Sequence, residues 1–232
     1  MVRPAMKRST KQAILDAAEE LFADYGFAAT SLRAITAAAQ VNLAAVNYHF
    51  GSKEALIDAV FARRVEPMNR ARLEALHELQ TAFVDAIVPL DRLIAAFVEP
   101  ALALSHDRTL GGQRFVRLLG RSLTEPAGAV HDSLRGRYVE VSEQFKSAFA
   151  RTLPELPAVE LYWRMHFMVG LLAYLMAGVD IMRLIASSRM SAHSEYDAVL
   201  PRLVSFIEAG MRAPVNADDT VSDLHPVSGA QL

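Results

Sequence analysis

The sequence predicts an all-α protein, and three observations lead to that expectation. Apolar residues recur at three- and four-residue spacings through nearly all of the 232 residues, and no segment shows sustained strand-type alternation. Helix-capping pairs stand where helices should begin, as in Ser9 followed by Gln12. Glycine and proline separate the periodic segments. Because 52% of the residues are apolar or aromatic, the chain can bury a substantial core.

The N-terminal part begins with two short helices. The first is expected over residues 10–25, and Gly26 ends it as a glycine cap. The second begins at Thr30 or Ser31, since both residues are suitable N-caps, and runs to about Ala39.

A short turn at residues 40–42 leads into a third helix. This helix is expected over residues 43–50, and Gly51 with Ser52 separates it from a fourth helix that Ser52 caps. A helix, a tight turn and a second short helix form a helix-turn-helix unit. In such a unit the second helix enters the major groove of DNA, while the first crosses the backbone.

The third helix carries small and uncharged polar side chains as its candidate DNA contacts. Ala44 and Ala45 let the helix backbone approach the base edges and can contact a thymine methyl, and Asn47 offers donors and acceptors. Tyr48 and His49 fit either a DNA contact or the packing of a small three-helix core.

Residues at the helix starts are candidate phosphate contacts. Ser31 and Arg33 begin the second helix and Lys53 begins the fourth, where hydroxyls, cations and free backbone N–H groups can hold phosphates. Phe50 is expected to pack in the core.

The segment Ala13–Phe61, AILDAAEELFADYGFAATSLRAITAAAQVNLAAVNYHFGSKEALIDAVF, resembles the DNA-binding domain of the TetR family of transcriptional regulators. The resemblance implies a regulator without catalytic activity or cofactor, bound to double-stranded DNA in the cytoplasm. It implies phosphate contacts from Ser31, Tyr48, His49 and Lys53. It implies base-edge or groove contacts from Arg33, Leu43, Ala44, Ala45 and Asn47.

A larger C-terminal domain is expected over residues 67–213, after an N-terminal domain of residues 1–66. Pro201 should delay or bend the start of its last helix. The tail at 214–232 holds three aspartates and no lysine or arginine, and is expected to be disordered. The expected helices of this domain lie at about 69–86, 91–105, 109–124, 128–152, 158–187 and 195–212.

The segment Leu161–Ile185 is apolar nearly all round, so both of its faces need cover. One face can line the domain interior, and the other can meet a second copy of the chain. Together with residues 195–212 it predicts a four-helix interface of a homodimer, which fits a pseudo-palindromic operator. An effector that favours wrongly spaced recognition helices would weaken DNA binding, with the helix from Lys53 towards Arg64 as the lever.

Three stretches more closely resemble a fatty-acid-responsive member of this family: ELYWRMHFMVGLLAYLMAGVDIMR from Glu160, VNLAAVNYHFGSK from Val41 and RFVRLLGRSL from Arg114. The resemblance implies a long-chain fatty acid or acyl-CoA as effector. The candidate pocket residues are Arg114, Phe115, Arg117, Leu118, Arg121, Phe167, Met168, Leu171, Leu172 and Leu175. The same residues fit a packed core, an interface and a solvated arginine face. His166 is expected to be a core or interface histidine.

Composition and motif spacing disfavour other classes of protein. The chain has no cysteine, which removes disulfides, thiolate metal sites and thiol catalysis, and its seven histidines form no local metal-binding or catalytic pair. Its longest apolar run is shorter than the roughly 20 residues of a membrane helix, so no membrane span is expected. Two alternatives remain beside a fatty-acid-responsive repressor. They are a TetR-type regulator of a drug or aromatic compound, and a lipid carrier without DNA function.

Overall fold

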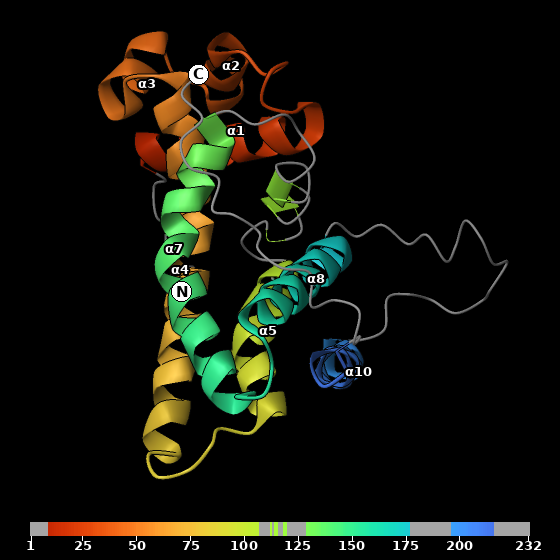
Figure 1. Cartoon of the computed structure of the whole chain (residues 1–232). Helices are drawn as coiled ribbons and strands as arrows, with labels where there is room; N and C mark the ends of the chain where they lie inside the picture. The colour runs from red at the N-terminus through yellow and green to blue at the C-terminus, as the bar shows by residue number, and fades with distance from the viewer. Residues whose placement is uncertain are drawn as a thin grey trace, which may run out of the picture.

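The computed structural model describes residues 9–106, 112, 114–115, 118–119, 129–176 and 196–215. Regular structure in this part of the chain is helical throughout, which confirms the predicted all-α class. The helices labelled in Figure 1 are α1 Thr10–Tyr25, α2 Leu32–Ala39, α3 Leu43–Phe50, α4 Lys53–Ala82, α5 Leu90–His106, α7 Ala129–Thr152, α8 Ala158–Met176 and α10 Tyr196–Met211.

Local capping fixes both ends of α1. The Ser9 hydroxyl accepts a hydrogen bond from the Gln12 backbone N–H at 3.2 Å, and the Gln12 side chain accepts one from the Ser9 N–H at 3.3 Å. At the other end Gly26 has a positive φ of 85°, and its N–H donates to the Phe22 carbonyl at 2.9 Å. A glycine is favoured there because side chains rarely tolerate positive φ.

The sequence left open whether Thr30 or Ser31 caps the second helix, and the structure gives the two residues different roles. Ser31 is the N-cap of α2, and its hydroxyl accepts from the Ala34 N–H at 3.1 Å. Thr30 is buried, and its hydroxyl donates to the Gly26 carbonyl at 2.7 Å and to the Leu21 carbonyl at 3.1 Å. Thr30 therefore ties the loop between α1 and α2 to the end of α1.

Helix α4 continues through Pro67, so the prediction of a separate helix beginning near residue 69 is wrong. Proline removes one backbone hydrogen bond from a helix interior. Tertiary packing offsets this loss, because Met68, Asn69, Arg72 and Leu76 on the following turns are all buried. Helix α4 packs against both α5 and α7 over this stretch.

The helices form two groups, and α4 packs against helices of both. Figure 1 shows α1, α2 and α3 grouped at one end, with α4 and α7 running side by side away from them. Helices α5, α8 and α10 lie beside this pair, and α10 packs against both α5 and α8. Helix α4 thus belongs physically to both ends of the molecule.

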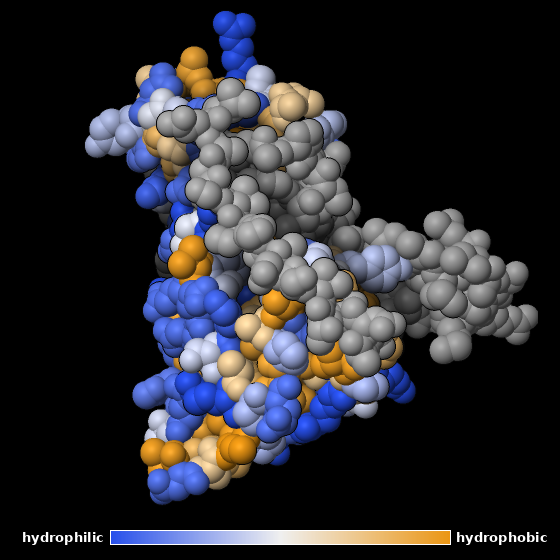
Figure 2. Space-filling view, viewed as in Figure 1, coloured by the Kyte–Doolittle hydropathy of each residue, from blue (hydrophilic) through white to orange (hydrophobic). Residues whose placement is uncertain are grey.

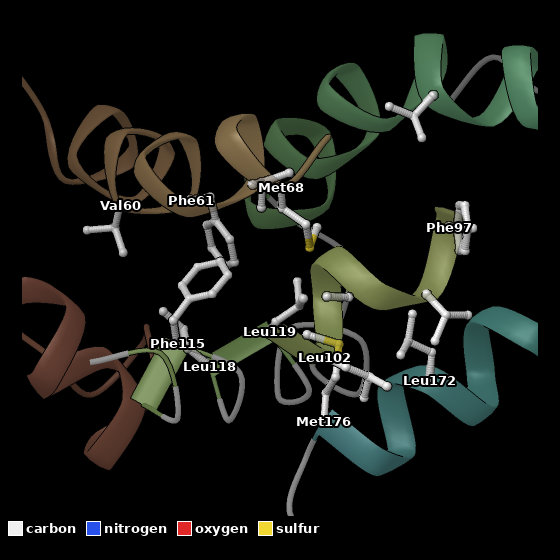
Figure 3. Close-up of a cluster of buried hydrophobic side chains, with 14 of the residues drawn as sticks. Val60, Phe61, Met68, Phe97, Leu102, Phe115, Leu118, Leu119, Leu172 and Met176 are labelled. Atoms are coloured by element: carbon white, nitrogen blue, oxygen red, sulfur yellow. The ribbon is translucent and has the colours of Figure 1, made fainter. Parts of the chain in front are cut away.

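A continuous apolar core follows this arrangement. In the close-up of Figure 3 the rings of Phe61 on α4 and Phe115 lie next to each other with Leu118 beside Phe115, and Leu102 and Met176 lie further along the same cluster. The two ring centroids are 5.8 Å apart, and all five side chains are buried. Full burial of a large apolar side chain stabilises a protein by roughly 1.5–3 kcal/mol.

Of the other sequence predictions, one is wrong and several concern residues outside the described part of the chain. Helix α10 begins at Tyr196 and contains Pro201, so the expected delay of its start is wrong. Most of the predicted helix 109–124, residues 177–187 of the predicted helix 158–187, and the tail beyond residue 215 lie outside the described residues. None of the helices in the described part of the chain is long and apolar enough to cross a bilayer.

Candidate nucleic-acid interface

The connection between α2 and α3 is a tight turn of three residues. Gln40 takes the left-handed conformation, with φ 54° and ψ 43°, and the Val41 N–H donates to the Thr36 carbonyl at 3.0 Å. Asn42 then caps α3, since its side-chain oxygen accepts from the Ala45 N–H at 2.8 Å. These bonds fix the direction in which α3 leaves the turn.

The inner side of α3 is anchored in the core. Val46 is fully buried, and the half-buried Ala45 and Phe50 pack against the same cluster. The packing predicted for Phe50 is therefore confirmed, and the Lys11 ammonium lies 5.9 Å from its ring centroid. Ala45, which the sequence proposed as a DNA contact, is less exposed than Ala44.

The outer side of α3 faces away from the protein. Leu43, Ala44, Asn47 and Tyr48 are exposed, and Tyr48 is 86% exposed. The half-buried His49 ring packs edge-on against the Tyr48 ring at a centroid distance of 5.1 Å. The exposure of Tyr48 disfavours the alternative in which it packs the three-helix core.

Polar and cationic groups flank this surface at two helix starts. Ser31 and Arg33 are exposed in and just before the first turn of α2, and the half-buried Lys53 is the first residue of α4. Glu54 follows Lys53, and hydrogen bonds from its own backbone N–H and from the Ser52 side chain lower its pKa. The start of α4 therefore carries a cation and a stabilised carboxylate side by side.

A buried ion-pair network joins α1 to α4 behind the helix-turn-helix unit. Glu19 is 3% exposed and pairs with both Arg63 and Arg64, and Arg63 also pairs with Asp16 at 2.6 Å. Burial alone would lower the pKa of Arg63, but Glu19 and Asp16 outweigh it and the pKa is raised. The Arg63 Nε is itself buried, and no group of the described residues accepts a hydrogen bond from it.

Three further contacts run from the first helices and α4 towards the larger helical part. Arg114 pairs with Glu20 of α1 at 3.2 Å, so this predicted effector residue contacts the end of the molecule that α1, α2 and α3 form. Phe115 stacks edge-on against Phe61, as described above. Arg137 of α7 pairs with Asp58 at 2.7 Å and with Glu66, both on α4.

The predicted effector residues do not all meet in one place. Phe115, Leu118, Met168 and Leu172 are buried in the common core, and Figure 3 shows three of them close to the α4 and α5 side chains. Leu171 is half-buried. The remaining residues are the exposed Arg114, Phe167 and Leu175, and Arg117 and Arg121, which lie outside the described residues.

Phe167 belongs instead to an exposed aromatic face on α8. Tyr162 is 65% exposed, Phe167 64%, and the Trp163 ring stacks on Phe167 at 6.0 Å. His166 is exposed on the same face, 6.4 Å from the Tyr162 ring. His166 is therefore not a core histidine of this chain. Figure 2 shows apolar surface over the region of α5, α8 and α10.

Sequence reasoning missed one buried polar cluster. Arg72 is 3% exposed, donates to the Phe97 carbonyl at 2.8 Å and to Asn69 at 3.3 Å, and lies over the Phe97 ring at 4.2 Å. Burial lowers the pKa of Arg72, and the electrostatic interaction and hydrogen bond with the half-buried Tyr138 partly offset this. Among the described residues no carboxylate pairs with Arg72. The available signal was an arginine four residues from both Met68 and Leu76 on an apolar helix face.

Two protein families match this chain, one over the N-terminal helices and one over the larger helical part. Residues 14–60 match the family of bacterial regulatory proteins named tetR, and residues 95–210, half of the chain, match the tetracycline repressor-like C-terminal domain. The chain belongs to the TetR family. Members of this family are DNA-binding regulators without enzymatic activity.

Individual relatives agree over parts of the chain. The transcriptional regulator UidR of Escherichia coli is 29% identical over 139 residues, which cover 58% of this chain and 61% of UidR. A transcriptional repressor of Mycobacterium tuberculosis is 47% identical over 57 residues, 25% of this chain and 30% of the repressor. The match thus spans less than two thirds of either relative.

Solved structures share the fold along most of the chain. The structure of AibR in complex with isovaleryl coenzyme A and operator DNA aligns with a TM-score of 0.60 and 17% identity. The alignment covers 85% of this chain and 97% of AibR. At this level of identity the likeness shows a common fold.

Proposed function

We propose that this chain is a TetR-type transcriptional repressor that binds double-stranded DNA as a homodimer and releases it when an effector binds. The observation that carries the proposal is the outer face of α3. A short helix held by Val46 and capped by Asn42 presents uncharged side chains outward, with Ser31, Arg33 and Lys53 at nearby helix starts. A helix of this kind fits the major groove. The protein would act in the bacterial cytoplasm.

The proposed contacts sort into two kinds. Phosphates are held by hydroxyls and cations, here Ser31, Tyr48, His49 and Lys53. Base edges are read by groups that enter the groove, here Arg33, Leu43, Ala44, Ala45 and Asn47. The half-buried state of Ala45 favours close approach of the helix over a contact of its own.

The homodimer is proposed through α8 and α10. An exposed cluster of aromatic residues on a helix marks an interaction surface, because monomers rarely leave large apolar patches uncovered. Tyr162, Trp163 and Phe167 on α8 form such a surface, and Phe206 on the adjacent α10 is 70% exposed. The residues of the larger part, 67–213, would then serve effector binding and dimerisation, and residues 1–66 DNA binding.

The proposed effector is a long-chain fatty acid or acyl-CoA. Its support is the run of buried apolar side chains around Phe115, Leu118, Met168 and Leu172, which can rearrange to admit a flexible chain. Buried Arg72 adds a cation without a carboxylate partner in the described part of the chain, which suits an acidic head group. AibR, which shares the fold, was captured with an acyl-CoA.

The effector signal has a physical route through α4. The Phe115 ring contacts Phe61, which lies 5.8 Å from Phe27, which in turn lies 5.3 Å from Phe22 of α1. An effector that displaces Phe115 would therefore disturb the packing of α1 against α4, which supports the helix-turn-helix unit. Typical couplings of about 1–3 kcal/mol change DNA affinity by roughly five- to 150-fold.

The test is selection of bound duplexes from a random pool at fixed salt, with and without oleoyl-CoA. Enrichment of a pseudo-palindrome that oleoyl-CoA releases supports both the regulator and the effector. A palindrome that oleoyl-CoA leaves bound contradicts the acyl-CoA effector and favours a drug or aromatic effector. A lipid carrier predicts acyl-CoA binding with no enriched sequence.

A further inference from the structure

The exposed face of α3 has an unusual chemistry for a DNA-reading surface. Leu43, Ala44, Asn47 and Tyr48 share one side of the helix, because they are spaced by single residues and full turns. The whole helix, LAAVNYHF, contains no lysine, arginine, aspartate or glutamate. Because Tyr48 and His49 are assigned to phosphates, base readout by α3 is left to apolar groups and a single side-chain amide.

Asn47 is the amide that remains available. The other asparagine of the region, Asn42, uses its side-chain oxygen to cap α3. The Asn47 side chain makes no hydrogen bond to any residue that the structure describes, and it is exposed. A side-chain amide matches the N6 donor and N7 acceptor that adenine presents in the major groove.

Leu43 and Ala44 supply the apolar part of the surface. Leu43 is 42% exposed although it is a large aliphatic residue, and it lies one turn before Asn47. The apolar group that bases offer in the major groove is the thymine 5-methyl. Methyl groups on base pairs next to the adenine would lie within reach of these two side chains.

We infer that α3 selects A·T base pairs in the operator, through thymine methyl groups against Leu43 and Ala44 and the adenine N6–N7 edge against Asn47. The inference rests on the proposed DNA-binding function. Guanine is most often read by arginine or lysine, which α3 lacks, so Arg33 on α2 is left for any guanine contact.

The experiment modifies single atoms of the operator. In the site obtained by selection, each thymine is replaced in turn by deoxyuridine, which lacks the methyl, and each adenine by 7-deazaadenine, which lacks N7. At one or two positions in each half-site, we expect deoxyuridine to weaken binding about fourfold, the effect of one buried methyl group. We expect 7-deazaadenine to weaken it about fivefold or more.

Variants then connect each atom to a side chain. Leu43→Ala should abolish the discrimination between thymine and uracil at the position that Leu43 contacts and leave it at the position that Ala44 contacts, and Asn47→Ala should abolish the sensitivity to 7-deazaadenine. Both positions are exposed and alanine favours helix, so the variants should fold. Gln144→Ala removes an exposed amide from α7 and serves as the matched control.

The possible failures are distinguishable. If the parent protein selects a palindrome but tolerates every deoxyuridine and 7-deazaadenine, the inference is wrong and the regulator stands. If the selected half-site has G·C pairs at the positions that α3 contacts, the inference is likewise wrong and the regulator stands. Failure to enrich any sequence overturns the proposed function together with the inference.

Discussion

At the scale of single residues, the charges around Glu19 decide how firmly the DNA-binding end is attached. One buried carboxylate holds two arginines of α4 against α1, whereas the neighbouring Glu20 makes a half-exposed pair with Arg114. Exposed pairs contribute little to stability because water screens them. Breaking a buried pair leaves an uncompensated charge, which costs more.

The contrast yields a prediction for Glu19→Gln. We expect this variant to lower the free energy of unfolding by about 2 kcal/mol. This loss is smaller than the loss on breaking a fully buried ion pair, because Arg63 and Arg64 keep some access to water. Urea denaturation of the full chain measures the change. Glu20→Gln is the control on the same helix, with an expected change below about 0.5 kcal/mol. Equal effects of the two substitutions would contradict a special role for Glu19.

Lys53 and Glu54 give opposite predictions for DNA binding. Lys53→Gln should weaken binding to every duplex and reduce the slope of log affinity against log salt by about 1, since one phosphate contact is lost. Glu54→Gln should strengthen binding, because it removes a negative charge beside the proposed phosphate site. Fluorescence anisotropy over a salt series measures both. A Lys53→Gln effect confined to the operator sequence would indicate base readout instead.

At the scale of elements, the sequence was informative wherever local chemistry sets a helix boundary. Ser9, Gly26, Ser31 and Ser52 each form the cap or stop that was expected of them, so α1 to α3 were predicted closely. The separate helix expected from residue 69 was wrong because the cost of Pro67 inside α4 depends on partners that are distant in sequence. The same holds for Arg72, whose contacts with Phe97 and Tyr138 come from other helices.

The turn between α2 and α3 contains a strained residue that can be tested. Gln40 has a positive φ of 54°, which is unfavourable for a residue with a Cβ atom. Gln40→Gly should therefore raise the free energy of unfolding by about 1 kcal/mol. Gln40→Ala, which keeps the Cβ, should leave it nearly unchanged. Thermal unfolding compares the two, and a destabilised glycine variant would mean that the Gln40 side chain stabilises the turn.

At the scale of the whole molecule, the chain must hold the proposed DNA-binding surface and the proposed dimer surface in a fixed orientation to each other. The outer face of α3 lies at one end, and the exposed aromatic residues of α8 and α10 lie in the larger part, with α4 between them (Figure 1). The apolar pattern of α8 predicted that both of its faces need cover. Among the residues that the structure describes, those of α8 that are buried within the chain include Leu161, Met168 and Leu172, which lie on one face. A second copy would cover the other face, and a two-fold dimer would then place both α3 helices on one operator.

Phe206→Asp tests that arrangement. Phe206 is 70% exposed on α10, so a charge there should not disturb the fold, but it would be costly inside an apolar interface. We expect the variant to sediment as a monomer at concentrations where the parent is a dimer. It should lose most of its operator affinity and keep its affinity for single half-sites. Val84→Asp changes a residue that is 79% exposed beyond the end of α4, and it should remain dimeric. A dimeric Phe206→Asp variant with unchanged operator binding would place the dimer interface elsewhere on the molecule.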